Sequence, residues 1–173
     1  MKTWDEDTIG TVYPILQRVV YNIMLNRILV PKIKERGVFD PYEIEFWTHI
    51  SNNAIQMAAL DWCKVFGSEN NEIYYEKYIN KECFLKRLKN MDYQKVRDDI
   101  RKFRNKYVAH CGLYDIPIPV FDDAIRIISA FQEEMEAEYD LHGLSLGSIE
   151  GLCEAYQIRI EDYLEQHNID FVP

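Results

Sequence analysis

The sequence contains few of the residues that build metal centres, disulfide frameworks or turn-rich folds. Its 173 residues include four cysteines, seven glycines and six prolines. The cysteines stand at least 20 residues apart and form no CxxC or Cys/His ligand spacing; they are Cys63, Cys83, Cys111 and Cys153. We therefore expect small buried thiols rather than metal ligands, and we expect no metal or other cofactor.

Several sequence signals are also missing. No run approaches the roughly 20 continuous apolar residues that a membrane span needs, and Trp4-Asp5-Glu6-Asp7 does not resemble a signal peptide. Neither a glycine-rich nucleotide-binding loop nor a Gly-x-Ser-x-Gly nucleophile elbow occurs. We expect a soluble cytoplasmic protein with no membrane partner.

The sequence is instead rich in apolar and aromatic residues, which make up 47% and 13% of the chain. This fraction is enough for a core and excludes a disordered chain. The first clear helical pattern places an apolar stripe on one face, with Pro14 in a first turn and Pro31 near the exit. The stripe consists of Val12, Ile15, Leu16, Val19, Val20, Ile23 and Met24.

Capping signals mark the later helices. Asp40-Pro41-Tyr42-Glu43 predicts a helix start with Asp40 as cap, and this helix should run to about Gly67. A shorter helix should follow the tyrosine-rich segment at 74–78. Asp92 can cap the next helix, whose apolar positions are Val96, Ile100, Phe103 and Tyr107 and which Gly112 should end.

Two further helices are expected at about 120–140 and 148–166. No segment alternates with period two for long enough to predict a sheet. The sequence therefore predicts an all-α bundle of about five or six helices, in a single domain that spans residues 1–173.

The charge is unevenly distributed along the chain. The net charge is -9, yet residues 77–106 carry 11 basic and 4 acidic side chains, whereas residues 107–173 carry 2 basic and 14 acidic ones. An acidic average argues against a protein that coats DNA or an anionic membrane, and we expect no double-stranded DNA partner. The basic segment, however, is a local exception to that average.

Basic and aromatic side chains alternate within this segment. The basic residues are Lys77, Lys81, Lys86, Arg87, Lys89, Lys95, Arg97, Arg101, Lys102, Arg104 and Lys106. The interleaved rings are Tyr78, Phe84, Tyr93, Phe103 and Tyr107. Such a surface can hold a phosphate backbone and stack unpaired bases. The alternative is a solvated helix face that pairs with the acidic C-terminal helices.

The basic segment ends in residues that suit phosphodiester chemistry, Arg104-Asn105-Lys106-Tyr107-Val108-Ala109-His110. Arg104 can neutralise a non-bridging phosphate oxygen in a bidentate way, and Asn105 can orient a group by hydrogen bonding. His110 can shuttle a proton near neutral pH. RNA supplies its own 2′-OH nucleophile, so this chemistry needs no metal. Residues that can contact phosphate nearby are Lys106, Arg101, Lys102 and Arg97.

This segment resembles the signature of HEPN domains, which is an arginine, usually a polar residue, and then a histidine after four to six intervening positions. Together with Trp62-Cys63-Lys64-Val65-Phe66-Gly67, it is most similar to the abortive-infection U-type (AbiU-like) branch. The number and order of the expected helices resemble the family over most of the chain.

The resemblance implies a helical bundle that forms a homodimer, in which the arginine and histidine of both chains line one cleft. Many members are metal-independent ribonucleases that serve as toxins or antiphage effectors. By this resemblance Arg104 and His110 are the catalytic pair, Asn105 orients them, RNA is the substrate, and an antitoxin or defence protein is a further partner. Gly112 stands where one toxin branch carries a tyrosine that its antitoxin modifies, so that regulation is not expected here.

The resemblance leaves two alternatives open. Other members bind nucleotides or act only as scaffolds, so the chain can also be a non-catalytic dimeric helical module that binds RNA, a nucleotide or a protein. In that case His110 caps the helix end or bonds a backbone carbonyl, and Arg104 pairs with Asp99 or with the acidic helices.

Helix geometry constrains the catalytic interpretation. On a straight α-helix, Arg104 and His110 differ in direction by about 240° and in height by about 9 Å. They converge only if the helix frays or tightens near Cys111-Gly112, or if the partner chain supplies the second residue. Lys106 is the same-face neighbour of His110, because the two stand four residues apart.

Other titratable residues offer weaker candidates. We interpret His49, which follows Trp47 on a mostly apolar helix, as a core or interface histidine. His142 and His167 fall in an expected turn and the tail. The glutamates of 133–138 have no accompanying Glu-x-x-His, so a di-iron bundle is not expected.

Overall fold

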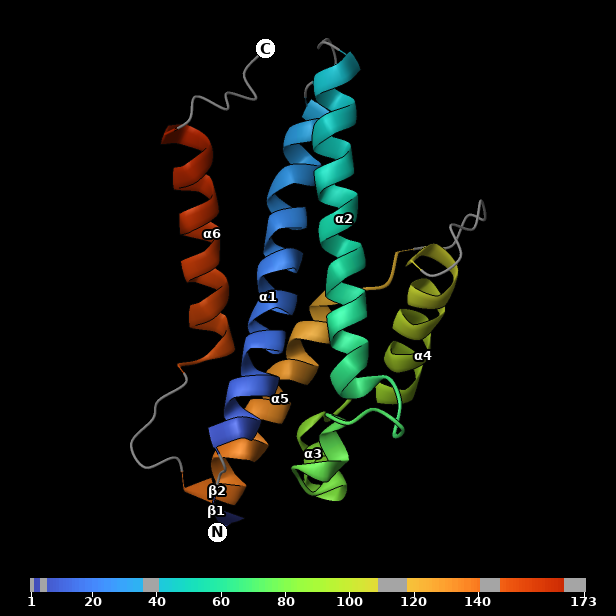
Figure 1. Cartoon of the computed structure of the whole chain (residues 1–173), viewed down its shortest axis with the longest axis vertical. Helices are drawn as coiled ribbons and strands as arrows, with labels where there is room; N and C mark the ends of the chain where they lie inside the picture. The colour runs from blue at the N-terminus through green and yellow to red at the C-terminus, as the bar shows by residue number, and fades with distance from the viewer. Residues whose placement is uncertain (1, 4–5, 36–40, 109–117, 141–146, 167–173) are drawn as a thin grey trace.

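Two long antiparallel helices form the spine of the bundle (Figure 1). In the computed structural model, which describes residues 2–3, 6–35, 41–108, 118–140 and 147–166, these are α1 (Glu6–Glu35) and α2 (Pro41–Phe66). The other helices are α3 (Lys81–Arg87), α4 (Tyr93–Phe103), α5 (Phe121–Glu138) and α6 (Ile149–Gln166). The all-α architecture expected from the sequence is therefore confirmed.

The shorter helices surround the α1–α2 pair. α6 packs along α1, α4 packs against α2, and α5 contacts α1, α3 and α4 (Figure 1). Within the described ranges the only strand pairing is a parallel one between the two-residue strands β1 (Lys2–Thr3) and β2 (Tyr139–Asp140). This pairing ties the start of the chain to the end of α5. No helix among the described residues is long and apolar enough to span a membrane.

Local capping explains where the middle helices begin. The Asp92 carboxylate accepts a hydrogen bond from the backbone N–H of Lys95 at 3.0 Å, so the predicted cap of α4 is confirmed. The Asn80 side chain accepts from the N–H groups of Glu82 and Cys83 and starts α3 in the same way. The predicted cap Asp40 lies outside the described residues, although α2 begins at Pro41 as expected.

The first helix begins earlier than the sequence predicts. Because α1 starts at Glu6, Pro14 lies inside the helix rather than in its first turn. Proline has no N–H, so the carbonyl of Gly10, four residues before it, loses its helical hydrogen bond. Gly10 is exposed and has no side chain, so water can reach that carbonyl. The helix continues through Pro14 although this one backbone hydrogen bond is lost.

The core lies mainly between α1, α2 and α5. Of the stripe predicted on α1, Ile15 is half-buried and the other six residues are buried. The apolar spacing along α2 predicts six inward positions: Ile44, Trp47, Ile50, Ile55, Ala58 and Trp62. The last three are buried, whereas the first three are half-buried. The first half of α2 is therefore covered on fewer sides than the sequence pattern indicates.

An aromatic cluster joins the C-terminal end of α2 to the rest of the bundle. The Phe66 ring lies 4.9 Å from the ring of Trp62, 5.8 Å from Tyr75 and 5.5 Å from Phe131, measured between centroids. Tyr75 belongs to the 3₁₀ turn η1 (Tyr75–Lys77), and Phe131 to α5. Rings at these separations stabilise each other beyond the area that they bury.

The turn after α2 requires glycine at position 67. The Gly67 N–H donates to the carbonyl of Cys63 at 3.0 Å, and a Cβ on Gly67 would lie 2.5 Å from that same oxygen. We expect Gly67→Ala to lower the free energy of unfolding by about 1–3 kcal/mol, because backbone must move to admit the methyl group. Urea denaturation measures this loss.

Gly10 provides the matched control, because a Cβ there would meet no atom within 4 Å. Gly10 lies in α1, so Gly10→Ala should stabilise the protein by about 0.5–1 kcal/mol. Equal effects of the two alanines would contradict the steric explanation.

Candidate functional site

The backbone changes its geometry where the proposed catalytic motif begins. α4 ends at Phe103, and the next five residues form the π-helical turn η2 (Arg104–Val108). Such turns close i→i+5 hydrogen bonds and occur often at functional sites. The helix therefore departs from α-geometry at Arg104, where its turn widens. From the sequence we considered a different change, a fraying or tightening further along, near Cys111-Gly112. His110 lies outside the described residues.

Three arginines of α4 and the adjoining turn η2 lie on the side that faces α2. Arg97, Arg101 and Arg104 follow one another at helical spacing, and all three positive charges act on the thiol of Cys63 in α2. Burial of Cys63 raises the pKa of this thiol, the three arginines lower it, and the result is a pKa of about 11. We call Arg97, Arg101 and Arg104 the arginine stripe.

The arginine stripe has few partners of its own. The Arg97 Nε donates to the carbonyl of Gly67 at 3.3 Å, and Arg101 lies 3.7 Å from the Asp98 carboxylate in the same helix. The Nε atoms of Arg101 and Arg104 are buried and have no hydrogen-bond partner within the described residues. A buried unsatisfied donor costs about 1–3 kcal/mol. Two such donors on adjacent turns favour an anion as their missing acceptor.

Two cations in the first half of the basic segment pair with acidic side chains of other elements. In the first half, Lys81 lies 2.8 Å from the Glu76 carboxylate, and Arg87 bonds Glu134 at 2.5 Å and Glu133 at 3.1 Å on α5. Pairing with the acidic helices, considered above as the alternative, is therefore correct for Arg87. In the described ranges, no residue of the arginine stripe pairs with α5 or α6.

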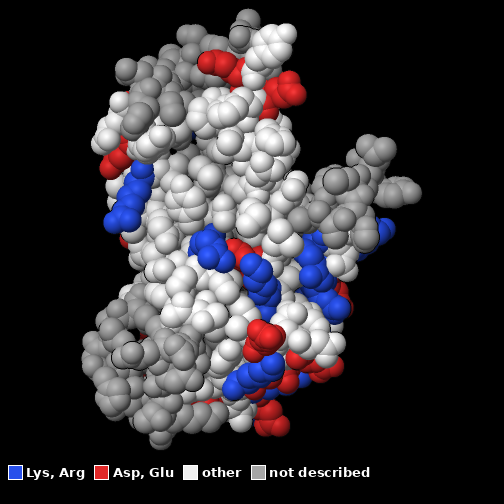
Figure 2. Space-filling model, viewed as in Figure 1, with Lys and Arg blue, Asp and Glu red and all other residues white. Residues whose placement is uncertain are grey.

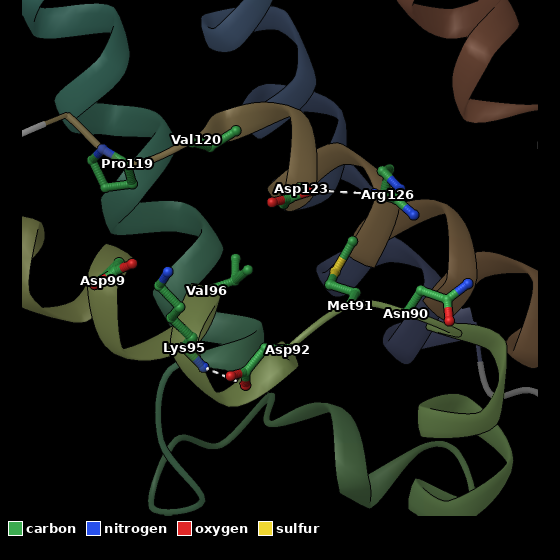
Figure 3. Close-up of a pocket in the computed structure, with 10 residues that line it drawn as sticks. All are labelled: Asn90, Met91, Asp92, Lys95, Val96, Asp99, Pro119, Val120, Asp123 and Arg126. Carbon is green, nitrogen blue, oxygen red and sulfur yellow. Dashed lines mark hydrogen bonds and ion pairs between the residues drawn. The ribbon is translucent and has the colours of Figure 1, made fainter.

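The acidic side of α4 lies away from the arginine stripe. A pocket of about 310 Å³ between α4 and α5 is lined by Asp92, Asp99 and Asp123, with Lys95 beside the first two on α4 and Arg126 paired with Asp123 on α5 (Figure 3). Asp99 therefore lines this pocket and forms no ion pair with Arg104 among the described side chains, contrary to the pairing considered from the sequence. Three carboxylates make the pocket unsuitable for a polyanion.

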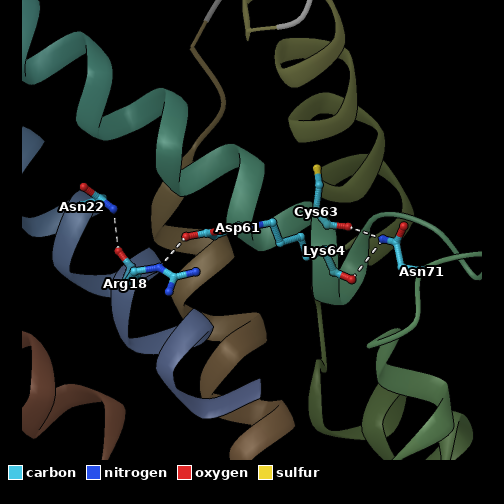
Figure 4. A network of polar contacts seen from close by, with 6 residues as sticks. All are labelled: Arg18, Asn22, Asp61, Cys63, Lys64 and Asn71. Carbon is cyan, nitrogen blue, oxygen red and sulfur yellow. Dashed lines mark hydrogen bonds and ion pairs between the residues drawn. The ribbon is translucent and has the colours of Figure 1, made fainter. Parts of the chain in front are cut away.

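Two more cations extend the basic surface across α2 to α1. The carboxylate of Asp61 is fully buried and is bonded by Arg18 Nε at 3.0 Å and by Lys64 Nζ at 2.5 Å (Figure 4). The side chains of Arg18 and Lys64 remain about half exposed, at 54% and 50%. In Figure 2, basic side chains gather in a band that runs from α1 over the lower end of α2 to α4.

The bonds to Asp61 favour its charged form. Burial acts to raise the pKa of this carboxyl, but the hydrogen bonds from Arg18 and Lys64 outweigh it and hold the pKa below its ordinary value. Sequence reasoning missed Asp61. The available signal was a single carboxylate inside the apolar run 58–63.

Asp61 should make the fold sensitive to acid. A carboxyl whose pKa is lower in the folded state contributes stability above its unfolded pKa of about 3.9, and this contribution is lost as the pH falls further. Asp61→Asn should cost about 1–2 kcal/mol at pH 7 and lose less additional stability between pH 6 and pH 3 than the wild type. Urea denaturation of both proteins across this pH range measures their free energies of unfolding and tests this prediction. Exposed Asp98→Asn, with the same charge change, should follow the wild-type profile.

The aromatic residues of the basic segment do not form a stacking surface. Phe84, Tyr93 and Phe103 are buried, at 0%, 8% and 2% exposure, and Tyr78 is half-buried. The prediction that these rings are available to bases is therefore wrong for the buried three, because they fill the core instead. The side chain of Tyr107 lies outside the part of the structure that is described.

Other predicted residues occupy the following positions. Lys102, Asn105 and Lys106 are exposed, as is His49, so the core interpretation of His49 is wrong. Cys63 is buried as expected, whereas Cys83 is exposed and Cys153 half-buried. Cys111, His142 and His167 are outside the described residues. Within the described part of the chain, no group of three or more His, Cys, Asp or Glu side chains is placed to hold a metal ion.

The two segments that carry the HEPN resemblance meet in space. The carbonyls of Cys63 and Lys64 accept hydrogen bonds from the Asn71 side chain at 2.7 and 3.0 Å, which fixes the end of α2 (Figure 4). The arginine stripe lies against this end of α2, so the run from Trp62 to Gly67 contacts the start of the Arg-Asn to His motif. Compared with protein-family models, with curated proteins and with solved structures, the chain has no match.

Proposed function

We propose that this chain is an HEPN-type, metal-independent endoribonuclease that acts on cytoplasmic RNA in antiphage defence or in a toxin–antitoxin system. One observation carries the proposal: the buried Nε atoms of Arg101 and Arg104 have no acceptor among the described residues, and they lie where the Arg-Asn to His motif begins. An RNA phosphate is a suitable acceptor, because guanidinium groups bind phosphate oxygens in a bidentate geometry.

In this proposal the residues of the motif have separate roles. Arg104 binds a non-bridging oxygen of the scissile phosphate, and Asn105 orients the reacting groups. His110 takes the proton of the 2′-OH or protonates the leaving oxygen, as imidazole can near neutral pH. Arg97, Arg101, Lys102 and Lys106 hold the neighbouring phosphates. The active protein is a homodimer, and its further partner is an antitoxin or another defence protein.

A second candidate function rests on the same surface. The arginine stripe can bind RNA or a nucleotide whatever His110 does, so a non-catalytic dimeric binding module has the same described residues in its favour. The two candidates differ in whether bound RNA is cleaved.

The deciding experiment is RNA cleavage in the presence of EDTA. Purified protein is incubated with total RNA, with tRNA and with double-stranded DNA of matched length, and the products are resolved by electrophoresis. The proposal expects cleavage of RNA alone, with EDTA having no effect. Filter binding on the same RNAs measures affinity: binding without cleavage in any RNA would favour the binding module, and absence of both would overturn the ribonuclease and an RNA-binding module together.

A further inference from the structure

One face of α2 is exposed and carries no formal charge. The stretch 46–60 contains no Lys, Arg, Asp or Glu. At about 100° per residue, six positions between 42 and 60 fall within an arc of about 80°; they are Tyr42, Phe46, His49, Asn53, Met57 and Leu60. Lys64 lies in the same arc one turn later and marks the charged end of this face. The first five of the six are exposed, with Tyr42 at 80%, Phe46 at 56% and Met57 at 44%, and Leu60 is half-buried. We call these six residues the uncharged face.

The surface view agrees with this description. Over α2, Figure 2 shows an extended area without charged side chains, with acidic side chains at its upper end and the basic band at its lower end. Exposed apolar side chains scattered singly are ordinary. Here three of them, Tyr42, Phe46 and Met57, share one helix face with uncharged polar residues between them, which suits a protein interface.

The order of residues on the uncharged face is nearly symmetric about position 51. If a second copy of α2 packs antiparallel about a two-fold axis there, Phe46 lies opposite Met57, Tyr42 opposite Leu60, and His49 opposite Asn53. In such an isologous interface each pair occurs twice. The symmetry thus matches an aromatic ring to a sulfur or an aliphatic side chain, and an imidazole to an amide.

The charges at the two ends of α2 favour the same orientation. Glu43 and Glu45 are exposed near the N-terminal end, whereas Lys64 and its neighbour Arg18 lie near the C-terminal end. Antiparallel packing brings each acidic end toward the basic end of the other copy, and parallel packing would bring like charges together. For a chain of net charge -9, a charge-free centre also avoids repulsion where the two copies are closest.

From these observations we infer that the uncharged face binds a second copy of this chain, with the two α2 helices antiparallel. The face is about 27 Å long, and a single helix of that length buries less than the roughly 800 Å² per partner of a standard interface. We therefore expect dissociation in the micromolar range. The Lys64 residues of the two copies stand about 40 Å apart, so each protomer keeps its own arginine stripe, and this dimer differs from the shared-cleft dimer that the HEPN resemblance implies.

Sedimentation equilibrium of the full chain, from about 1 to several hundred micromolar, tests the inference. The wild type should dimerise, and Phe46→Lys and Met57→Glu should each be monomeric, because each places two unpaired charges in the interface. Ile158→Lys and Ile158→Glu on α6, where the side chain is 58% exposed, are the matched controls and should dimerise like the wild type. Circular dichroism and thermal melting confirm that every variant is folded.

Mixing the two monomeric variants tests the antiparallel arrangement itself. In a Phe46→Lys and Met57→Glu heterodimer, the new lysine lies opposite the new glutamate on one side, and the native Phe46–Met57 pair remains on the other. The mixture should therefore regain at least about tenfold in affinity over either variant alone. A wild type that stays monomeric, a dimer that both variants leave intact, or a mixture that stays monomeric would each overturn the inference. None of these measurements involves RNA, so they leave the ribonuclease proposal to its own test.

Discussion

Replacing His110 by alanine should reduce RNA cleavage by about 10²–10⁴-fold, the usual contribution of a general acid or base. RNA affinity should change by less than about twofold, because electrostatic contacts to phosphate carry most of the affinity of such surfaces. Single-turnover cleavage in EDTA measures the first quantity and filter binding on the same RNA the second. The wild-type rate should also change with pH around neutrality, and this dependence should disappear in the variant.

Two further variants make this result specific. Arg104→Ala should lower both cleavage and binding, because its guanidinium contacts phosphate in the bound state as well as in the transition state. Lys95→Ala, which removes a cation from the pocket on the far side of α4, should leave both unchanged. If His110→Ala cleaves RNA as fast as the wild type, the catalytic proposal is wrong, and retained binding would then support the non-catalytic module.

The helices were predictable because their signals are local. Asp92 caps α4 through a bond to a residue three positions away, and Pro41 starts α2 by fixing its own backbone angle. Pro14 is the exception, because it lies inside α1 and not in the first turn as predicted. The cost of placing Pro14 inside α1 depends on the exposure of Gly10, four residues earlier, and the apolar periodicity of the sequence does not predict that exposure.

The candidate site was predictable only in part, since its geometry depends on contacts between distant segments. The helical spacing of Arg97, Arg101 and Arg104 is visible in the sequence, but which of them pairs with an acid depends on how α5 and α6 pack. The burial of Phe84 follows from the position of Phe66, 18 residues earlier. Basic and aromatic residues interleaved in sequence can therefore face opposite sides of one helix.

The π-helical turn at Arg104 was not predictable from spacing. A helical wheel assumes a constant angle per residue, and that assumption fails where the turn widens. The angle of about 240° between Arg104 and His110 therefore does not hold across this turn. His110 lies outside the described residues, so the Arg104–His110 pair stays a prediction.

Removing the arginine stripe should produce the largest change in RNA affinity. With all three arginines replaced by glutamine, we expect binding to weaken on the order of a hundredfold at low salt, since each lost phosphate contact costs about 1 kcal/mol. The plot of log affinity against log salt should also become shallower by about 2, because each phosphate contact to a single strand contributes about 0.7 to its slope.

A second triple variant separates a binding surface from a general effect of charge. Lys86→Gln, Lys89→Gln and Lys95→Gln remove the same number of positive charges from exposed positions outside the arginine stripe. If RNA is bound at the stripe, this control should lose less than about fivefold in affinity and keep a nearly wild-type salt slope, since its lysines contact no phosphate there. Equal losses in the two variants would mean that RNA responds only to net charge. Because the two proteins have the same net charge, only the position of the charges can make them differ.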